Sequence, residues 1–149
     1  MPVLERRLTI AADPQALAQT LAAVEHWPRW TGFVRTVEPP AVDVAVDNAW
    51  NIVALLGSMP FSAVARLQVA EDGRQVTLET LTSAAPVNLA RYVFLVGSGT
   101  QPSVTLRVQY TFARGPGGWL VERAMVRRKL PRQLEAALAG LADTAARTT

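Results

Sequence analysis

Hydrophobic and polar residues alternate along most of this chain, which is the pattern of β-strands that bury one face. Seven runs show it: residues 3–10 (VLERRLTI), and then FVRTVE, AWNIVALL, FSAVARLQVAE, RQVTLETLT, VNLARYVFLV and SVTLRVQYTFA between residues 33 and 113. Turns such as GSM and EDG are short, and no helix-length run separates the last six strands. This order predicts an antiparallel meander rather than a parallel α/β sheet.

Two of these runs indicate which face of the sheet is buried. In residues 103–112 the apolar side comprises Val104, Leu106, Val108, Tyr110 and Phe112. In residues 61–69 it comprises Phe61, Ala63, Ala65, Leu67 and Val69. Because side chains alternate across a strand, the sheet should have one apolar face and one wet face.

Helical periodicity replaces the alternation near both ends of the chain. After the first strand, Asp13 and Pro14 suit a helix start, and Leu17, Leu21 and Val24 form one buried stripe. The following WPRW predicts a tight turn or a one-turn helix. A second helical pattern extends over residues 119–147, and Pro131 within it predicts a kink or a break between Arg127 and Leu130.

Composition limits the chemistry open to this protein. The 149 residues suit a single domain, 1–149, and half of them are hydrophobic. With no cysteine and one histidine, we expect neither a disulfide nor a metal site, and no motif calls for a cofactor. No apolar run is long enough to cross a bilayer, and the charged amino terminus lacks the apolar segment of a signal peptide, so we expect a cytoplasmic protein.

The order of these elements resembles the START-related (SRPBCC) superfamily, and within it the polyketide cyclase/dehydrase type. The segment IAADPQALAQTLAAVEHWPRW is similar to the strand, Asp-Pro, helix and Trp-Pro-x-Trp with which such proteins open. VTLRVQYTF is similar to their last strand, and GPGG with the arginine-rich, leucine-spaced helix is similar to their ending. The resemblance implies an α+β helix-grip fold: a seven-stranded curved antiparallel sheet wrapped around a long carboxyl-terminal helix, with two short helices after the first strand.

That resemblance also implies a cavity between sheet and helix. A single helix is too narrow to cover a seven-stranded apolar face, and small residues such as Ala54, Ala63 and Ala65 leave room there. A hydrophobic, polyketide-like small molecule is the expected ligand. Two functions stay open: the protein promotes cyclisation or dehydration of this ligand, or it is a non-catalytic carrier, sensor or sequestration protein.

Tyr110 is the candidate catalytic residue, because alternation places its phenol on the apolar face. The expected ligand-binding residues are Trp30, Trp50, Phe61, Asn88, Arg91, Tyr92, Phe94, Leu106 and Met125. In residues 87–96 the register is open: either Asn88 faces inward with Tyr92, or Arg91 does. The same ambiguity applies to Trp50 and Asn51.

The other titratable residues are expected to be structural or solvated. His26 stands at the end of the first helix, where capping or exposure is its expected state. Glu71, Asp72, Glu79 and Glu122 fall on polar positions or in turns, so we expect them on the solvated surface. An apolar pocket with few neutral polar groups suits binding and orientation of a flexible substrate better than hydrolysis or redox chemistry.

Basic residues gather near the carboxyl end, although the net charge is only +3. Arg123, Arg127, Arg128 and Arg132 predict a docking surface for an acidic acyl carrier protein, if the ligand is delivered on one. Nucleic acid is not expected as a partner, because no aromatic residues interleave with the arginines.

Overall fold

The computed structural model describes residues 3–10, 12–39, 49–84, 87–97, 103–112, 120 and 122–148. Its strands are β1 (Val3–Thr9), β2 (Val34–Glu38), β3 (Ala49–Leu56), β4 (Met59–Val69), β5 (Gln75–Ser83), β6 (Val87–Val96) and β7 (Ser103–Phe112). Its helices are α1 (Pro14–Ala22), the 3-10 helix η1 (Val24–Arg29), the π-helix η2 (Glu122–Val126) and α3 (Leu130–Thr148). The predicted GPGG turn and helix start at residue 119 lie outside the described residues.

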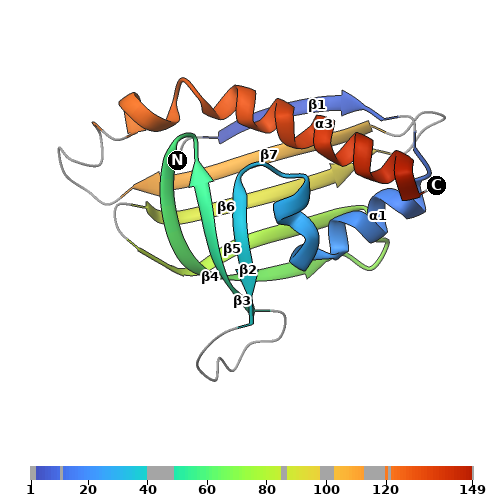
Figure 1. Ribbon diagram of the computed structural model, residues 1–149, viewed down its shortest axis with the longest axis horizontal. Coiled ribbons are helices and arrows are strands. Elements are labelled where there is room, and N and C mark those ends of the chain that lie inside the picture. Colours follow the sequence, from blue (N-terminus) through green and yellow to red (C-terminus); the bar gives the residue numbers. More distant parts are fainter. Residues whose placement is uncertain are drawn as a thin grey trace.

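All seven strands form one antiparallel sheet in the order β1-β7-β6-β5-β4-β3-β2. The sheet curves strongly, so that β2, β3 and β4 cross in front of β5, β6 and β7, while α3 runs along the top and α1 and η1 close one end (Figure 1). The predicted helix-grip fold, with two short helices after the first strand, is confirmed.

The apolar face predicted from alternation is the inner face of this curved sheet. In β7 the side chains of Val104, Leu106 and Val108 are fully buried, and Tyr110 is nearly so. In β4 the alternation holds from Phe61 to Leu67 and then fails at Val69, which is 47% exposed at the end of the strand. Burial on this face therefore follows the period of two except where the strand ends.

A β-bulge decides the open register in β6. Pairing between β6 and β7 shifts between Val87 and Leu89, so Val87 is buried inward and Asn88 is exposed. The expectation that Asn88 would share the inner face with Tyr92 is therefore wrong, because the extra residue changes the parity of the strand. Arg91 lies on the outer face, where it pairs across the strands with Glu79 and Gln109.

The helices at one end are joined to each other and to the sheet by aromatic residues. Trp27 is fully buried, and its Nε1 donates a hydrogen bond of 3.0 Å to the carbonyl oxygen of Leu21 in α1. Trp30 follows η1, and its backbone lies so close to Gly140 of α3 that a Cβ there would clash with the Trp30 carbonyl. Asp13 occupies the N-cap position of α1, although its side chain makes no capping hydrogen bond.

The carboxyl-terminal helical pattern is broken where Pro131 predicts. η2 ends at Val126, residues 127–129 form a turn, and α3 begins at Leu130. Pro131 is then the second residue of α3, where a missing N–H removes no intrahelical hydrogen bond. A break thus accommodates the proline without loss of backbone bonding.

Hydrogen bonds join the turn between β3 and β4 to η2 and α3, the helices on either side of this break. The side-chain amide of Gln133 donates to the Gly57 carbonyl oxygen and accepts from the Gly57 N–H, both at 2.9 Å. The N–H and the hydroxyl of Ser58 both donate to the Met125 carbonyl oxygen, at 2.8 and 3.1 Å. These four hydrogen bonds tie the hairpin of the sheet to the carboxyl-terminal helices.

Gly57 should be the least replaceable residue of this contact. It has φ +64°, and a Cβ there would clash with the backbone of Met125 and Val126. We expect Gly57→Ala to destabilise the protein by about 3 kcal/mol or more, measured by chemical denaturation. Gly73→Ala is the matched control: φ is +71°, but the nearest atom is 3.6 Å away, so about 1 kcal/mol is expected. Equal losses would contradict a close approach at Gly57.

Candidate functional site

Five aromatic residues form the part of the inner face beneath the helices. The rings of Trp27 and Trp30 each contact the ring of Phe94, with centroids 5.3 and 5.7 Å apart. Phe33 and Tyr92 stack nearly parallel at 4.6 Å. Of the predicted ligand-binding residues, Trp30, Tyr92 and Phe94 are thus brought together by η1 and β6.

The remaining predicted residues are distributed over both faces. Phe61 and Leu106 are buried inside, and Met125 packs partly buried against the core from η2. Trp50 pairs with the buried Ala65 and packs against the core, whereas Asn51 pairs with Val64 on the outer face. Asn88 and Arg91 also belong to the outer face, which removes them from the group that could contact an internal ligand.

Several buried polar atoms of the inner face have no hydrogen-bond partner among the described residues. They are Nε1 of Trp30, Nε1 of Trp50, the hydroxyl of Tyr92 and the hydroxyl of Ser83. Buried polar groups are nearly always paired, and each of these four can donate. The inner face therefore has spare donors that acceptor oxygens of a ligand or of water would satisfy.

Tyr110 lies near the end of β7, one inward row from Tyr92, and has a partner that the sequence did not reveal. Its hydroxyl donates a hydrogen bond of 3.0 Å to Oε1 of Glu122, which is only 7% exposed. Arg127 donates to both carboxylate oxygens, from Nε at 3.1 Å and from its terminal nitrogen at 3.0 Å. The expectation that Glu122 would be solvated is therefore wrong.

The π-helix explains why this partner was missed. In η2 the N–H of Arg127 bonds the carbonyl oxygen of Glu122, five residues back, at 2.9 Å. An ordinary α-helix places residues three or four apart on one face, so a spacing of five gives no signal in the sequence. The wider turn brings Arg127 over Glu122 and directs the carboxylate toward β7.

The environment of Tyr110 raises the pKa of its phenol to about 12. Burial is the largest cause, followed by the hydrogen bond to Glu122 and its negative charge, while the charge of Arg127 acts in the opposite direction. Tyr110 therefore stays protonated and acts as a hydrogen-bond donor rather than a ready source of protons. A cavity of about 190 Å³ adjoins the cluster, and Leu4, Leu130 and Pro131 help to line it.

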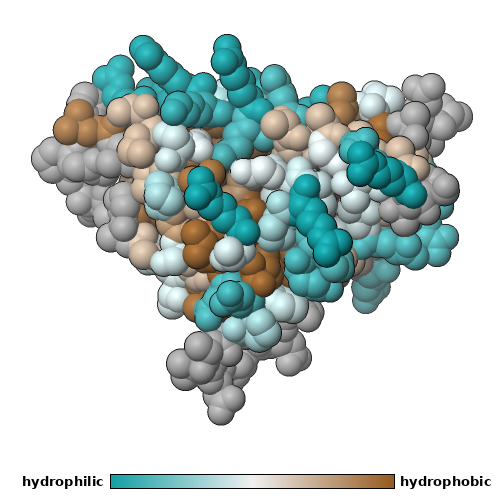
Figure 2. Space-filling model, viewed as in Figure 1, coloured by the Kyte–Doolittle hydropathy of each residue, from teal (hydrophilic) through white to brown (hydrophobic). Residues whose placement is uncertain are grey.

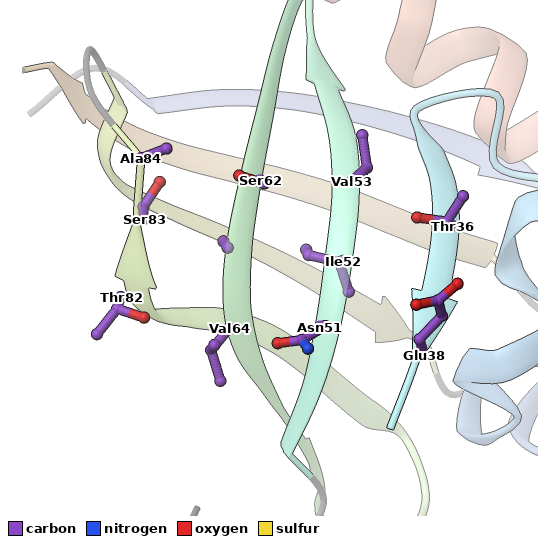
Figure 3. A pocket seen from close by; sticks show the side chains of 11 residues that line it. Thr36, Glu38, Asn51, Ile52, Val53, Ser62, Val64, Thr82, Ser83 and Ala84 are labelled. Carbon is purple, nitrogen blue, oxygen red and sulfur yellow. The ribbon is translucent and has the colours of Figure 1, made fainter. Parts of the chain in front are cut away.

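A second hollow lies on the outer face of the sheet, where the sequence indicated only a wet surface. It has a volume of about 460 Å³ and is formed by four neighbouring strands, β2 to β5 (Figure 3). Its lining includes Thr36, Glu38, Asn51, Ser62 and Thr82. We name it the outer groove.

Two further hollows lie beside the helices and include titratable residues. His26 is exposed on η1 and lines a hollow of about 250 Å³ with Arg29, Trp30 and Thr144. Arg123, Arg127 and Arg128 line a basic hollow of about 620 Å³ with the exposed Leu120. Within the described residues no three His, Cys, Asp or Glu side chains cluster as metal ligands would, and no helix is long and apolar enough to cross a membrane.

Comparison with solved structures identifies the class of fold. A START superfamily protein from Mycobacterium smegmatis superposes with a TM-score of 0.73 at 9% identity, over 99% of both chains. A protein from Thermus thermophilus reaches 0.76 at 14% identity over 99% of both chains. The Zhui aromatase/cyclase from Streptomyces sp. R1128 reaches 0.68 at 14% identity, over 99% of this chain and 96% of that one.

This chain therefore has the START-like helix-grip fold that polyketide aromatase/cyclases share. At the level of sequence, no protein-family model and no curated protein matches it. Identities this low establish the fold alone.

The two tyrosines of the chain should not ionise near pH 10.0, the ordinary pKa of a phenol, because burial raises the pKa of Tyr92 and raises that of Tyr110 to about 12. Their neutral forms stabilise the fold fully below about pH 10, and this contribution is lost as pH rises through the folded-state pKa values. A spectrophotometric titration at pH 10 should show almost no phenolate in the native protein and about half in guanidinium. Substantial phenolate at pH 10 in protein that circular dichroism shows to be folded would contradict the burial of both hydroxyls.

Proposed function

We propose that this chain binds a hydrophobic, polyketide-like small molecule on the inner face of the sheet and promotes its cyclisation or dehydration. The observation that carries this proposal is the cluster of Tyr110, Glu122 and Arg127, which places a buried phenol and a buried carboxylate at the end of an otherwise apolar face. The aromatase/cyclase among the structural neighbours supports the substrate class by analogy of fold.

Binding would use both kinds of group on the inner face. The aromatic residues around Phe94 offer a large apolar contact area, since rings of this kind bury much surface with few rotatable bonds. The unpartnered donors of Trp30, Trp50 and Tyr92 would bond carbonyl oxygens of the ligand. Such contacts fix which carbon atoms of a flexible chain lie near each other, and orientation alone accelerates ring closure.

The chemical step would use Glu122 as the base. Its carboxylate would accept a proton from a carbon between two carbonyls, while Tyr110 donates a hydrogen bond to the carbonyl oxygen that becomes negative. For this the Tyr110 hydroxyl would exchange its hydrogen bond to Glu122 for one to the substrate oxygen. The carbanion attacks a second carbonyl carbon, and the resulting alkoxide takes the proton back from Glu122. Ring closure then needs no co-reactant, and the alcohol formed can lose water.

Two substitutions test these roles with a poly-β-keto substrate. Tyr110→Phe should lower kcat about a hundredfold with little change in Kd, because it removes only a donor to the transition state. Glu122→Gln keeps the shape but removes the base and should abolish turnover. Thr77→Val is the control, since it deletes the hydroxyl of a buried residue of β5 that has no role in the proposed site, and kcat should stay within threefold of wild type. A normal cyclisation rate in Tyr110→Phe would remove the role of Tyr110.

A non-catalytic carrier, sensor or sequestration protein is the second candidate. The observation that favours it is that Tyr110, Glu122 and Arg127 already satisfy one another without a ligand, as residues of a purely structural cluster do. In the incubations above, tight binding of a substrate that is recovered unchanged from wild-type protein would establish this function and exclude catalysis.

An acidic acyl carrier protein is the partner that the basic end of the molecule would suit. Arg128, Lys129 and Arg132 are exposed around the turn between η2 and α3, and Leu120 beside them is 58% exposed. Arg127 forms an ion pair with Glu122, so the positive charge that attracts the partner would come chiefly from Arg128, Lys129 and Arg132. Complementary charge of this kind increases association rates and weakens with salt.

Charge reversal tests this partner. We expect Arg128→Glu with Arg132→Glu to weaken binding of an acyl carrier protein at least tenfold at low salt, and wild-type binding to weaken as salt rises. Arg35→Glu in β2 with Arg74→Glu in the turn before β5 changes the net charge equally and should leave affinity nearly unchanged. Equal losses in the two double variants, or binding that ignores salt, would contradict a specific dock.

A further inference from the structure

The outer groove combines an apolar floor with polar side chains that have no hydrogen-bond partner among the described residues. Val53 and Val64 contribute apolar surface, and Val53 is 37% exposed. On the face seen in Figure 2, hydrophobic side chains reach the surface between longer hydrophilic ones. Within the part of the chain that the structure describes, the side chains of Thr36, Asn51 and Thr82 make no hydrogen bond. Their donors and acceptors are therefore available to a ligand.

The hollow has a structural cause in two β-bulges. Pairing between β2 and β3 shifts between Val34 and Thr36, and pairing between β4 and β5 shifts between Val64 and Ala65. Bulges bend a strand and increase its local twist, which hollows the surface between them. Several outward positions between the bulges carry short side chains such as Ser62 and Thr82, which leaves the hollow open among the described residues.

Two rows of outward residues cross the groove. Cross-strand pairing places Glu38, Asn51, Val64 and Thr82 in one row, and Thr36, Val53 and Ser62 in the next. Neighbouring strands lie about 4.8 Å apart, so the hydroxyl, amide and carboxylate groups repeat at roughly that spacing. Glu38 is the one charged residue among the described residues of the lining.

We propose that the outer groove binds a sugar, either free or as the glycosyl part of a larger molecule. A pyranose has an apolar face of C–H groups and an edge of hydroxyls, which match the valines of the floor and the polar groups of the two rows. The Glu38 carboxylate accepts from sugar hydroxyls, and the Asn51 amide both donates and accepts. A volume of about 460 Å³ lies within the range of small-molecule sites. This site is separate from the inner face, so it does not depend on the function proposed above.

Saturation-transfer NMR with a panel of methyl hexosides tests the proposal, at about 10 mM because a few hydrogen bonds typically give millimolar Kd values. We expect at least one methyl hexoside to bind wild-type protein. Asn51→Leu and the isosteric Thr82→Val should each weaken binding about tenfold, since each leaves sugar hydroxyls unpaired. Gln109→Leu and Thr105→Val, comparable changes on the outer face of β7, are the controls and should bind like wild type.

Three outcomes would overturn the proposal: no methyl hexoside binds, the groove variants bind as well as the controls, or only amine-bearing compounds bind and Glu38→Gln abolishes this binding. Thermal denaturation of every variant separates loss of binding from loss of folding. Binding of a hydrophobic compound to the inner face, followed in the same variants, should not change.

Discussion

One constraint shapes this molecule: a single antiparallel sheet with an apolar inner face must be closed by helices that are narrower than the sheet. Curvature solves part of the problem, since β2 to β4 turn back over β5 to β7 (Figure 1). Close backbone contacts solve the rest, at Gly140 beneath Trp30 and at Gly57 beneath Met125. Both contacts need glycine, because any Cβ would separate the helices from the elements that they cover.

The break before α3 connects this closure to the candidate chemistry. Pro131 limits where an α-helix can begin, and the preceding residues form a π-helix instead of continuing α3. That π-helix presents the Met125 carbonyl to the β3–β4 turn and brings Glu122 and Arg127 together beside Tyr110. Isolated π-turns often occur at functional sites. Here the same turn hydrogen-bonds the β3–β4 turn and positions the buried carboxylate of Glu122.

The two faces of the sheet differ in the chemistry they offer. The inner face is apolar, with aromatic rings and a few unpartnered donors. The outer groove places polar side chains over an apolar floor, with one carboxylate among the described residues of its lining. The bulges at Arg35 in β2, Leu81 in β5 and Asn88 in β6 determine which residues belong to each face, because each bulge changes the parity of its strand. Asn88 shows the consequence, since one extra residue moves it from the expected inner face to solvent.

The local pattern of the sequence was sufficient for the strands, the first helix, the break near Pro131 and the order of elements, because alternation, helical stripes and proline act over a few residues. It also placed Tyr110 on the buried face, but it left the register of Tyr92 and Phe94 open. The partner of Tyr110 and the outer groove could not be found in this way. Glu122 is buried because a π-turn changes the spacing of side chains, and the groove lies between bulges in two separate strands, β2 and β5. The burial of Glu122 and the outer groove both depend on contacts between segments distant in the sequence, which no local pattern encodes. Only the tertiary structure, with its curved sheet and the helices packed over it, determines them.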